Sequence, residues 1–573
     1  MKTISANNSP MLNAYPDSMG GTLTDILNVL KRPEFENTLG SFYILPSLFN
    51  TDLDRGFSVI NYELNEQLAK RENLEELGKL GMDLKLDFIL NHASVLSEQF
   101  QDIIKNGEES KYKDFFINWN KFWEGHGTMT ADGYIQPDKE LIKNMFFRKP
   151  GLPILMVRFP DGKNVPYWNT FYQEVKYPVV DAQDIMKAAD IQYYAADEIA
   201  SILNRAIADG NKPGEIDFGK YDKYKAAVVE YMESNRKYLG QMDLNIKSPM
   251  VWEFYDDVLK RLSEYGAKII RLDAFAYAPK EPGEKNFLNE PGTWDVLQKV
   301  QKLADKYHLS LLPEIHASYG EKNYEQISSK GYMTYDFFLP GLIIDALENA
   351  DGTTMKKWAD EIIEKEIKTV NMLGCHDGIP LLDLKGLIPE ERIGRLIDTV
   401  VLRGGMVKDL HGQKNVYYQV NSTYYSALGE DDRKMLMARA LQLFMPGKPQ
   451  IWYLDLFVGK NDHEAVKRAG AGGHKEINRT NLSKEQMDRL LEREVVKKQL
   501  EMLRFRKTFP AFSFDSDIHV ESNENKMVFT WEKNGYVAAL HADLKEMQFI
   551  ISGIDKHGIQ TYAMEIGEEI KTC

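Results

Sequence analysis

The sequence predicts an α/β fold, a (β/α)₈ barrel, and three observations lead to this prediction. Short apolar runs alternate with helical patterns along most of the chain, as in a parallel sheet built from βα units. Several runs are apolar on both faces, as strands buried between two layers must be. Eight parallel strands with helices between them close into a barrel. The eight expected strands are Leu12–Pro16, Phe42–Pro46, Leu84–Leu90, Lys268–Asp273, Ser310–Ile315, Met333–Leu339, Thr369–Leu373 and Gln450–Leu454.

Two long intervals interrupt this alternation. About 178 residues separate the third strand from the fourth, too many for one helix and its loops. We therefore expect an inserted domain over 93–245, in which Asp181–Asp209 and Tyr221–Leu239 read as helices. About 75 residues separate the seventh strand from the eighth, which predicts a second excursion above the barrel.

The chain after residue 508 has a different pattern. Apolar and polar residues alternate over Met527–Glu532 and Tyr536–Leu540, and Asn534-Gly535 between them is a hairpin signal. A small antiparallel β domain is therefore expected at the carboxyl end. The expected organisation is a barrel in three parts (1–92, 246–380 and 431–507), an inserted domain (93–245) with an extra helical insertion near 172–240, a loop domain above the barrel (381–430) and a carboxyl-terminal β domain (508–573).

Composition and charge exclude several classes of protein. Of 573 residues, 43% are hydrophobic and 27% charged, and the net charge is −15, which disfavours binding to nucleic acid or to an acidic membrane. No run approaches the 18 apolar residues of a spanning helix, and the amino end has no apolar signal core. The two cysteines, Cys375 and Cys573, exclude a disulfide framework and a zinc cluster. A multidomain cytoplasmic protein is expected.

Polar residues gather at the carboxyl ends of the expected strands, which is where barrels of this kind place their chemistry. Carboxylates, histidines and an arginine would meet at one mouth, and this composition indicates carboxylate acid–base and nucleophilic chemistry on a neutral polyol. The histidines lie singly on different strands, so no metal site is expected. The residues concerned are Asp87, Asn91, His92, Arg271, Asp273, Glu314, His316, His376 and Asp377.

Four of these segments resemble the conserved blocks of the α-amylase superfamily, glycoside hydrolase family 13. They occur in the family's order and on the expected strands. The segments are Asp87–His92, Ile270–Ala274, Leu312–His316 and Cys375–Gly378.

Further segments resemble one branch of that family, the sucrose phosphorylases and their relatives that act on sucrose 6′-phosphate. The likeness runs from about residue 12 to about residue 533, and about 70 residues between Phe171 and Gln241 have no counterpart in the shorter members. The segments are Asp54–Phe57, Ser110–Ile117, Gln419–Leu428, Gly459–Asp462 and Asn478-Arg479.

The resemblance implies a double-displacement reaction with retention. Asp273 would attack the anomeric carbon, Glu314 would protonate the departing fructosyl oxygen and then act as a base, and Asp377 would stabilise the transition state. A retaining mechanism needs its two carboxyl groups about 5–5.5 Å apart. Arg271 is expected to keep Asp273 ionised, whereas Glu314 needs a raised pKa.

The resemblance also implies a set of substrate-binding residues. Inorganic phosphate rather than water would attack the glucosyl–enzyme, and Arg148 and Lys149 would admit this anion. No cofactor or metal is implied. His316 either contacts the ligand or is a satisfied core histidine. The substrate-binding set is Asp54, Phe57, His92, Phe171, Gln241, Arg271, Tyr277, His316, His376, Tyr418, Gln419 and Arg479.

The acceptor side departs from the pattern of the branch. Val416 stands where sucrose-specific members often place an Asp against fructose, and Tyr418 resembles the sucrose phosphorylases rather than the enzymes for sucrose 6′-phosphate, which tend to carry His. Tyr15–Gly21 is closer to the second group. We expect unphosphorylated sucrose as the donor, with sucrose 6′-phosphate as the alternative.

Other functions remain open at this point. Another α-glucoside phosphorylase, such as one for glucosylglycerol, a transglucosidase or a hydrolase of the same superfamily would show the same blocks. A non-catalytic superfamily member is disfavoured because Asp273, Glu314 and Asp377 are all present. The expected partners are small-molecule substrates, with no nucleic acid and no membrane, and a homodimer is left open. The helical insertion could be a lid, a dimer element or neither.

Overall fold

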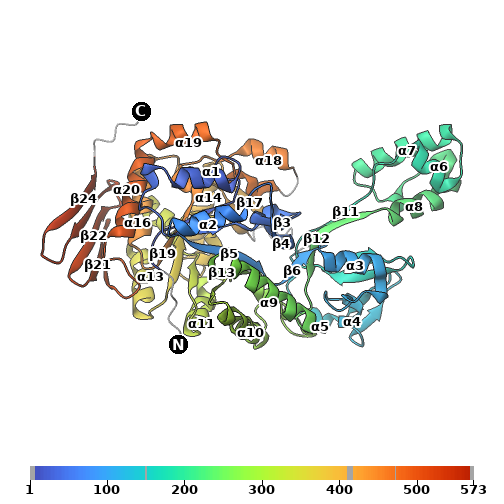
Figure 1. The fold of residues 1–573 in the computed structure, drawn as a ribbon, viewed down its shortest axis with the longest axis horizontal. Helices are drawn as coiled ribbons and strands as arrows, with labels where there is room; N and C mark the ends of the chain where they lie inside the picture. The colour runs from blue at the N-terminus through green and yellow to red at the C-terminus, as the bar shows by residue number, and fades with distance from the viewer. Residues whose placement is uncertain (1–6, 149–150, 410–416, 471–472, 568–573) are drawn as a thin grey trace.

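The centre of the computed structural model, which describes residues 7–148, 151–409, 417–470 and 473–567, is a barrel of eight parallel strands (Figure 1). Its strands follow the order β14-β13-β5-β2-β1-β19-β16-β15. Each of the eight predicted runs forms one of these strands, so the predicted fold class is confirmed. The strands are β1 (Met11–Ala14), β2 (Ser41–Ile44), β5 (Asp83–Ile89), β13 (Ala267–Asp273), β14 (Ser310–Pro313), β15 (Thr334–Asp336), β16 (Thr369–Met372) and β19 (Lys448–Trp452).

Helices cover the outside of the barrel and explain why its strands are apolar on both faces. Every residue of β1 and β2 is buried, because one face points into the barrel and the other packs against a helix. The helices are amphipathic; α9, for example, buries Val251, Tyr255, Val258, Leu259 and Leu262 at helical spacing. The covering helices are α1 (Leu23–Leu30), α2 (Arg71–Lys79), α9 (Pro249–Glu264), α10 (Gly292–Lys306), α11 (Asn323–Ser329), α12 (Leu339–Asn349), α13 (Thr353–Glu364), α14 (Glu390–Leu402), α16 (Asp432–Phe444) and α20 (Glu494–Thr508).

The long interval between β5 and β13 forms a separate lobe beside the barrel mouth (Figure 1). Its core is a group of tryptophans, Trp119, Trp123 and Trp168, packed against one another. The lobe contains β6 (His92–Ser94), α3 (Glu98–Asn106), α4 (Trp119–Phe122), β7 (Gly127–Met129), β8 (Ile135–Pro137), α5 (Lys139–Ile142), β9 (Ile154–Arg158) and β10 (Asn164–Trp168).

Two antiparallel strands, β11 (Gln173–Lys176) and β12 (Lys237–Asp243), lead from this lobe to three helices set apart from the barrel (Figure 1). We call residues 173–240 the arm. Its helices, α6 (Ala182–Ala189), α7 (Tyr193–Ala208) and α8 (Lys225–Ser234), have a hydrophobic cluster of their own.

Two helices expected in the arm differ from those in the structure. The expected helix Asp181–Asp209 is two helices, because Asp190 takes a left-handed conformation (φ 49°) that ends α6. The expected helix Tyr221–Leu239 is too long at both ends, since α8 spans only Lys225–Ser234 and the chain then enters β12. Residues 237–243 pair with β11 and β6, and helical periodicity carries no sign of such long-range pairing.

The interval between β16 and β19 carries a small two-stranded sheet, β17 (Met406–Asp409) and β18 (Tyr417–Asn421). Ile379 and Val420 form a backbone bridge with hydrogen bonds of 2.8 and 3.1 Å, which ties β18 to the loop after β16. Gly378 allows this approach, because it has a φ of 108° and a Cβ there would meet the Val420 carbonyl at 2.6 Å. Short helices complete the interval and the barrel rim: α15 (Tyr424–Ala427), α17 (Tyr453–Leu456), α18 (His463–Ala469) and α19 (Lys484–Leu491).

The carboxyl-terminal segment is an antiparallel sheet of five strands. Asn534 (φ 50°) and Gly535 (φ 81°) form the two-residue turn that the sequence predicts between its second and third strands. Trp531 donates a 2.8 Å hydrogen bond to the Phe444 carbonyl of α16, which fixes the sheet to the barrel. The strands are β20 (Asp517–Asn523), β21 (Lys526–Lys533), β22 (Tyr536–Asp543), β23 (Gln548–Ile554) and β24 (Gln560–Ile566).

Among the residues that the structure describes, none of the helices is long and apolar enough to span a membrane.

Candidate active site

Three carboxylates lie at the carboxyl-terminal mouth of the barrel. Asp273 is the last residue of β13, Glu314 follows β14 directly, and Asp377 lies in the loop after β16. Parallel strands bring their carboxyl ends to the same edge, so residues more than a hundred positions apart in the sequence meet at one place. This mouth is where the sequence predicted the chemistry.

Arg271 joins these carboxylates from within the barrel. Its Nη1 lies 2.6 Å from Asp87 Oδ1 and 2.9 Å from Asp273 Oδ1, and its Nη2 lies 2.6 Å from Glu314 Oε1. Asp87 is fully buried and also accepts a 2.8 Å hydrogen bond from Tyr43. Asp87 therefore anchors the guanidinium, and the guanidinium holds Asp273 and Glu314 side by side.

The protonation of this pair differs from the sequence expectation. Burial raises the pKa of Asp273, and the nearby carboxylates of Glu314, Asp87 and Asp377 add to the rise. Burial also raises the pKa of Glu314, but Arg271 and His316 outweigh it and leave this pKa low. Arg271 lies nearer to Glu314 than to Asp273, so its charge favours the ionised form of Glu314.

Asp377 is held ionised by three cationic or polar neighbours. Its carboxylate lies 3.1 Å from His376 Nε2, 2.7 Å from Lys475 Nζ and 3.8 Å from Arg479 Nη2. Burial alone would raise the pKa of Asp377, but these groups lower it well below its usual value. Lys475 was missed in the sequence. The available signal was its position four residues before Arg479, a spacing that places two side chains on one side of a helical turn.

Asp54 pairs with both cations, Lys475 and Arg479. Arg479 Nη1 lies 3.6 Å and Lys475 Nζ 3.9 Å from the Asp54 carboxylate. Asp54 and the next residue, Arg55, both have left-handed backbones, with φ of 49° and 47°. Such strain in two consecutive residues with side chains persists only where the surroundings enforce it. Arg55 is fixed by Asp17 at 3.1 Å and by the Arg479 carbonyl.

Aromatic side chains line the same mouth. Phe57 stacks on His376 with ring centres 4.9 Å apart, and Phe171 lies 5.0 Å from His92 and 5.2 Å from Tyr277. These rings form flat apolar walls at the mouth.

Gln241 fixes the backbone at Phe57 and at Tyr172, the residue next to Phe171. Its amide donates to the Phe57 carbonyl at 2.9 Å and accepts from the Tyr172 amide at 3.1 Å. His92 Nε2 also lies 3.0 Å from the Phe57 carbonyl. Both ends of the Gln241 amide are thus engaged by backbone groups of the protein.

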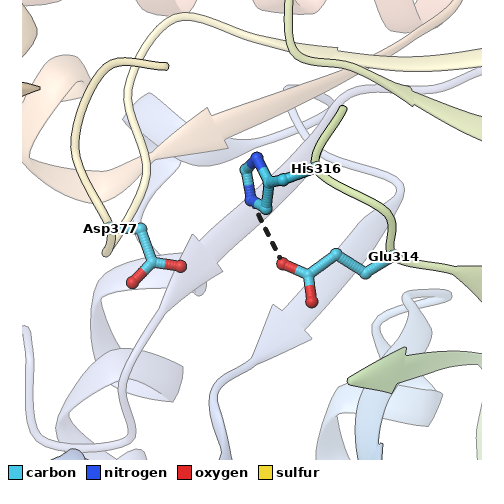
Figure 2. Close-up of side chains that lie close together, drawn as sticks. All are labelled: Glu314, His316 and Asp377. Carbon is cyan, nitrogen blue, oxygen red and sulfur yellow. Dashed lines mark ion pairs between the residues drawn. The ribbon is translucent and has the colours of Figure 1, made fainter. Parts of the chain in front are cut away.

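His316 projects from the loop that carries Glu314, and Asp377 faces both from the opposite side (Figure 2). Donor atoms of the three lie within 4.8 Å of one another. A cation there would compete with charges already present, since Arg271 contacts Glu314 and Lys475 contacts Asp377. The cluster is therefore arranged as a network of ion pairs. Asp383, which lies 3.3 Å from His316 Nδ1, was not predicted.

The structure describes only some of the residues predicted to bind phosphate or the acceptor. Arg148 donates a 3.0 Å hydrogen bond to the Tyr277 hydroxyl and lies over the Phe171 ring at 5.1 Å, so it belongs to the same mouth. Lys149 lies outside the described residues, and of Tyr418 only the backbone, in β18, is described. Buried Gln419 Nε2 and His376 Nδ1 have no hydrogen-bond partner among the described residues.

The chain is similar to known proteins over nearly its whole length. No family model matches the chain. The chain is 48% identical over 554 residues to "Sucrose 6(F)-phosphate phosphorylase" of Ilumatobacter coccineus, with 95% of each chain covered. It is 31% identical to the protein of the same name from Thermoanaerobacterium thermosaccharolyticum and 29% identical to "Sucrose phosphorylase" of Streptococcus mutans, in both cases over 96% of this chain and 98% of the relative.

Solved structures give the same result. The crystal structure of sucrose 6F-phosphate phosphorylase from Thermoanaerobacter thermosaccharolyticum matches with a TM-score of 0.80 and 30% identity, over 99% of both chains. The α-amylase of H. orenii matches with a TM-score of 0.58 at 14% identity, which is a likeness of fold alone.

Proposed function

The chain belongs to the sucrose phosphorylase and sucrose 6′-phosphate phosphorylase branch of glycoside hydrolase family 13, and from this premise we propose that it transfers a glucosyl group from a sucrose-type donor to inorganic phosphate with retention. The observation that carries the proposal is the guanidinium of Arg271, which contacts both Asp273 and Glu314. A retaining reaction needs a nucleophile and an acid–base group about 5–5.5 Å apart, and one planar group that bridges both keeps them close.

In the first half of the reaction, an oxygen of Asp273 forms a bond to the anomeric carbon as the bond to the departing oxygen breaks. Glu314 delivers a proton to that oxygen. Asp377, held ionised by Lys475 and Arg479, stabilises the positive charge that develops on the sugar ring. These roles are proposals that the positions of the three carboxylates support.

In the second half, an oxygen of inorganic phosphate attacks the same carbon and releases Asp273, which gives α-glucose 1-phosphate. A dianion needs local positive charge in a protein of net charge −15. Arg148, which lies against Tyr277 and Phe171 at the mouth, is the described residue that we propose for this task.

Two donors are candidates. The sequence predicts unphosphorylated sucrose from Tyr418. Sucrose 6′-phosphate is favoured by the 48% and 31% identities to relatives named for that substrate. The reaction at the glucosyl carbon is the same for both, so the donors differ only in how the fructosyl side is bound.

The test is incubation of the purified chain with sucrose or sucrose 6′-phosphate, each with and without inorganic phosphate. α-Glucose 1-phosphate and free glucose are measured. Phosphate-dependent α-glucose 1-phosphate supports the proposal, and whichever of the two sugars yields it is the donor. Free glucose alone would contradict phosphorolysis. Asp273→Asn should abolish both products, whereas the matched change Asp161→Asn at an exposed carboxylate should abolish neither.

Two proposals concern the setting of the enzyme. A cytoplasmic location is supported by the low number of cysteines and is tested by cell fractionation. A homodimer is supported by exposed apolar residues on the arm, among them Val179 at 87% and Tyr194 at 72% exposure. Light scattering on the intact chain and on a Val179→Ser variant tests it.

A further inference from the structure

The imidazole of His316 lies between two carboxylates. Its Nε2 is 3.4 Å from Glu314 Oε1, and its Nδ1 is 3.3 Å from Asp383 Oδ2. The ring stacks on Phe337 with centres 3.9 Å apart, which fixes its plane. A neutral imidazole has one N–H, whereas the imidazolium has two. Only the charged ring presents a donor to both carboxylates.

The charges around His316 favour that imidazolium. The ionisable groups that face it are Glu314 and Asp383, with the carboxylate of Asp377 within the same 4.8 Å cluster. Burial lowers the pKa of His316, but hydrogen bonds and charge from Asp383 and Glu314 outweigh it and raise this pKa to about 10. Arg271 contacts Glu314 through Nη2, so it stabilises the carboxylate.

This arrangement leaves a gap in the acid step. The departing oxygen needs a proton, yet Arg271 and His316 hold Glu314 in its ionised form, which carries none. Two described groups pair with Glu314: Arg271, which is permanently charged, and His316, whose Nε2 lies 3.4 Å from Glu314 Oε1 and carries a proton in the imidazolium.

We propose that His316 stores the proton that Glu314 delivers to the departing oxygen, and takes it back in the second half of the reaction. The inference rests on the proposed glucosyl transfer. His316 acts only through Glu314, to which it gives the proton and from which it takes it back. It makes no bond to the sugar, so we call it a positioning residue.

The proton and the bonds balance over one cycle. In the first half the bond from C1 to the leaving oxygen breaks and the bond from C1 to Asp273 forms. The Nε2 proton passes to Glu314, the Glu314 carboxyl gives a proton to the leaving oxygen, and His316 becomes neutral. In the second half monohydrogen phosphate bonds to C1 through an unprotonated oxygen and displaces Asp273. Its remaining proton passes to Glu314 and back to His316, which leaves the dianion of α-glucose 1-phosphate.

The leaving group provides the test. Fluoride departs from α-D-glucosyl fluoride without needing a proton, so a loss confined to acid catalysis spares this donor. His316→Asn should lower kcat/KM by about 10²-fold or more on the sugar donor that the wild type uses. On α-D-glucosyl fluoride with phosphate the loss should stay below about threefold. Glu314→Gln should show the same selective loss.

Two controls separate this role from a structural one. His376→Asn, at the sugar-binding wall, should lower turnover of both donors alike. A similar loss on both donors in His316→Asn would overturn the inference, because the residue would then support the site as a whole. An unchanged rate in His316→Asn would also overturn it and would place the proton on the Asp273–Glu314 pair.

A second variant keeps the imidazole and changes only its neighbour. Asp383→Asn removes one of the two charges that raise the pKa of His316, so the alkaline limb of kcat/KM on the sugar donor should move to lower pH. A limb that stays in place in this variant would contradict the inference. If the wild type makes no α-glucose 1-phosphate from α-D-glucosyl fluoride and phosphate, the proposed function itself fails, whatever the variants do.

Discussion

Lys475 Nζ lies 2.7 Å from the Oδ1 atom of Asp377, which makes this lysine of the short helix Gly473–Asn478 the nearest described cation to the carboxylate proposed to stabilise the transition state. The same ammonium lies 3.9 Å from Asp54. The charges of Asp377 and Asp54 raise the pKa of Lys475 above its usual value although burial opposes this. The negative charges of Asp377 and Asp54 at the mouth are therefore balanced by a cation of the protein itself.

Lys475→Met should weaken glucosyl transfer without unfolding the barrel. A hydrogen bond to a charged group contributes about 1.5–3 kcal/mol, so kcat/KM for the donor should fall by about 10- to 150-fold. Steady-state kinetics on the donor and on phosphate would measure it. Lys475→Arg keeps the charge and should retain most of the activity. Equal activity of the Met variant and the wild type would show that this ion pair does not serve the reaction.

Arg148→Ala should act on phosphate rather than on the donor. The change removes a charged group beside Tyr277 and Phe171, and we expect KM for phosphate to rise by about 10- to 100-fold. KM for the donor should change by less than about threefold. Initial rates at varied phosphate and fixed donor would check this. A rise in KM for the donor alone would show that phosphate binds elsewhere.

Lys280→Met should destabilise the attachment of the inserted lobe. The ammonium is buried and lies 2.8 Å from Asp243 Oδ2, 3.0 Å from Asn91 Oδ1 and 2.5 Å from the Tyr277 carbonyl. Removing one partner of a buried ion pair costs about 3–5 kcal/mol, which urea denaturation would show. The exposed pair Lys143–Glu140 is the control, since Lys143→Met should cost less than about 1 kcal/mol. Similar small losses in both variants would contradict the prediction.

Lys448 should make stability depend on pH. Burial lowers its pKa from 10.5 to about 7, although three oxygens of Asn7 and Ser9 accept its hydrogen bonds. Between pH 7 and 10.5 the unfolded chain binds more protons here than the folded one, so this group makes stability rise with pH over that window. The difference in unfolding free energy between wild type and Lys448→Met should therefore shift in favour of the wild type from pH 7 to pH 9. A constant difference would mean that Lys448 titrates normally.

Replacing residues 177–236 by Asn-Gly should leave the barrel folded. Lys176 and Lys237 face each other in the β11–β12 ladder, so a two-residue turn can join them. The arm helices bury their apolar residues in their own cluster, and we expect unchanged glucosyl transfer. The ratio of free glucose to α-glucose 1-phosphate should also stay the same. A higher share of glucose would instead support a lid that excludes water.

The barrel and its three carboxylates were predictable from the sequence because both depend on local patterns. Strands buried on two faces are runs of apolar residues, and the positions of Asp273, Glu314 and Asp377 follow from where those runs end. The motif resemblance then supplied the roles.

What the sequence did not reveal depends on contacts between distant segments. Lys475 meets Asp377 across 98 positions, and Asp383 meets His316 across 67. The first residues of β12, 237–239, were read as the end of a helix because the partners of this strand, β11 and β6, come from elsewhere in the chain. The protonation of Asp273 and Glu314 was not predicted correctly either, because it depends on how closely Arg271 and His316 approach these carboxylates.

The link between β18 and the loop after β16 has a consequence for engineering. Asn421 donates a 2.7 Å hydrogen bond to the Asp377 carbonyl, and Val420 bridges Ile379. The strand that carries Tyr418 and Gln419, residues that the family resemblance places in substrate binding, therefore also holds the backbone of Asp377. Libraries that vary this strand to accept new sugars will alter the alignment of the glucosyl step at the same time, so each clone must be screened for turnover as well as for product.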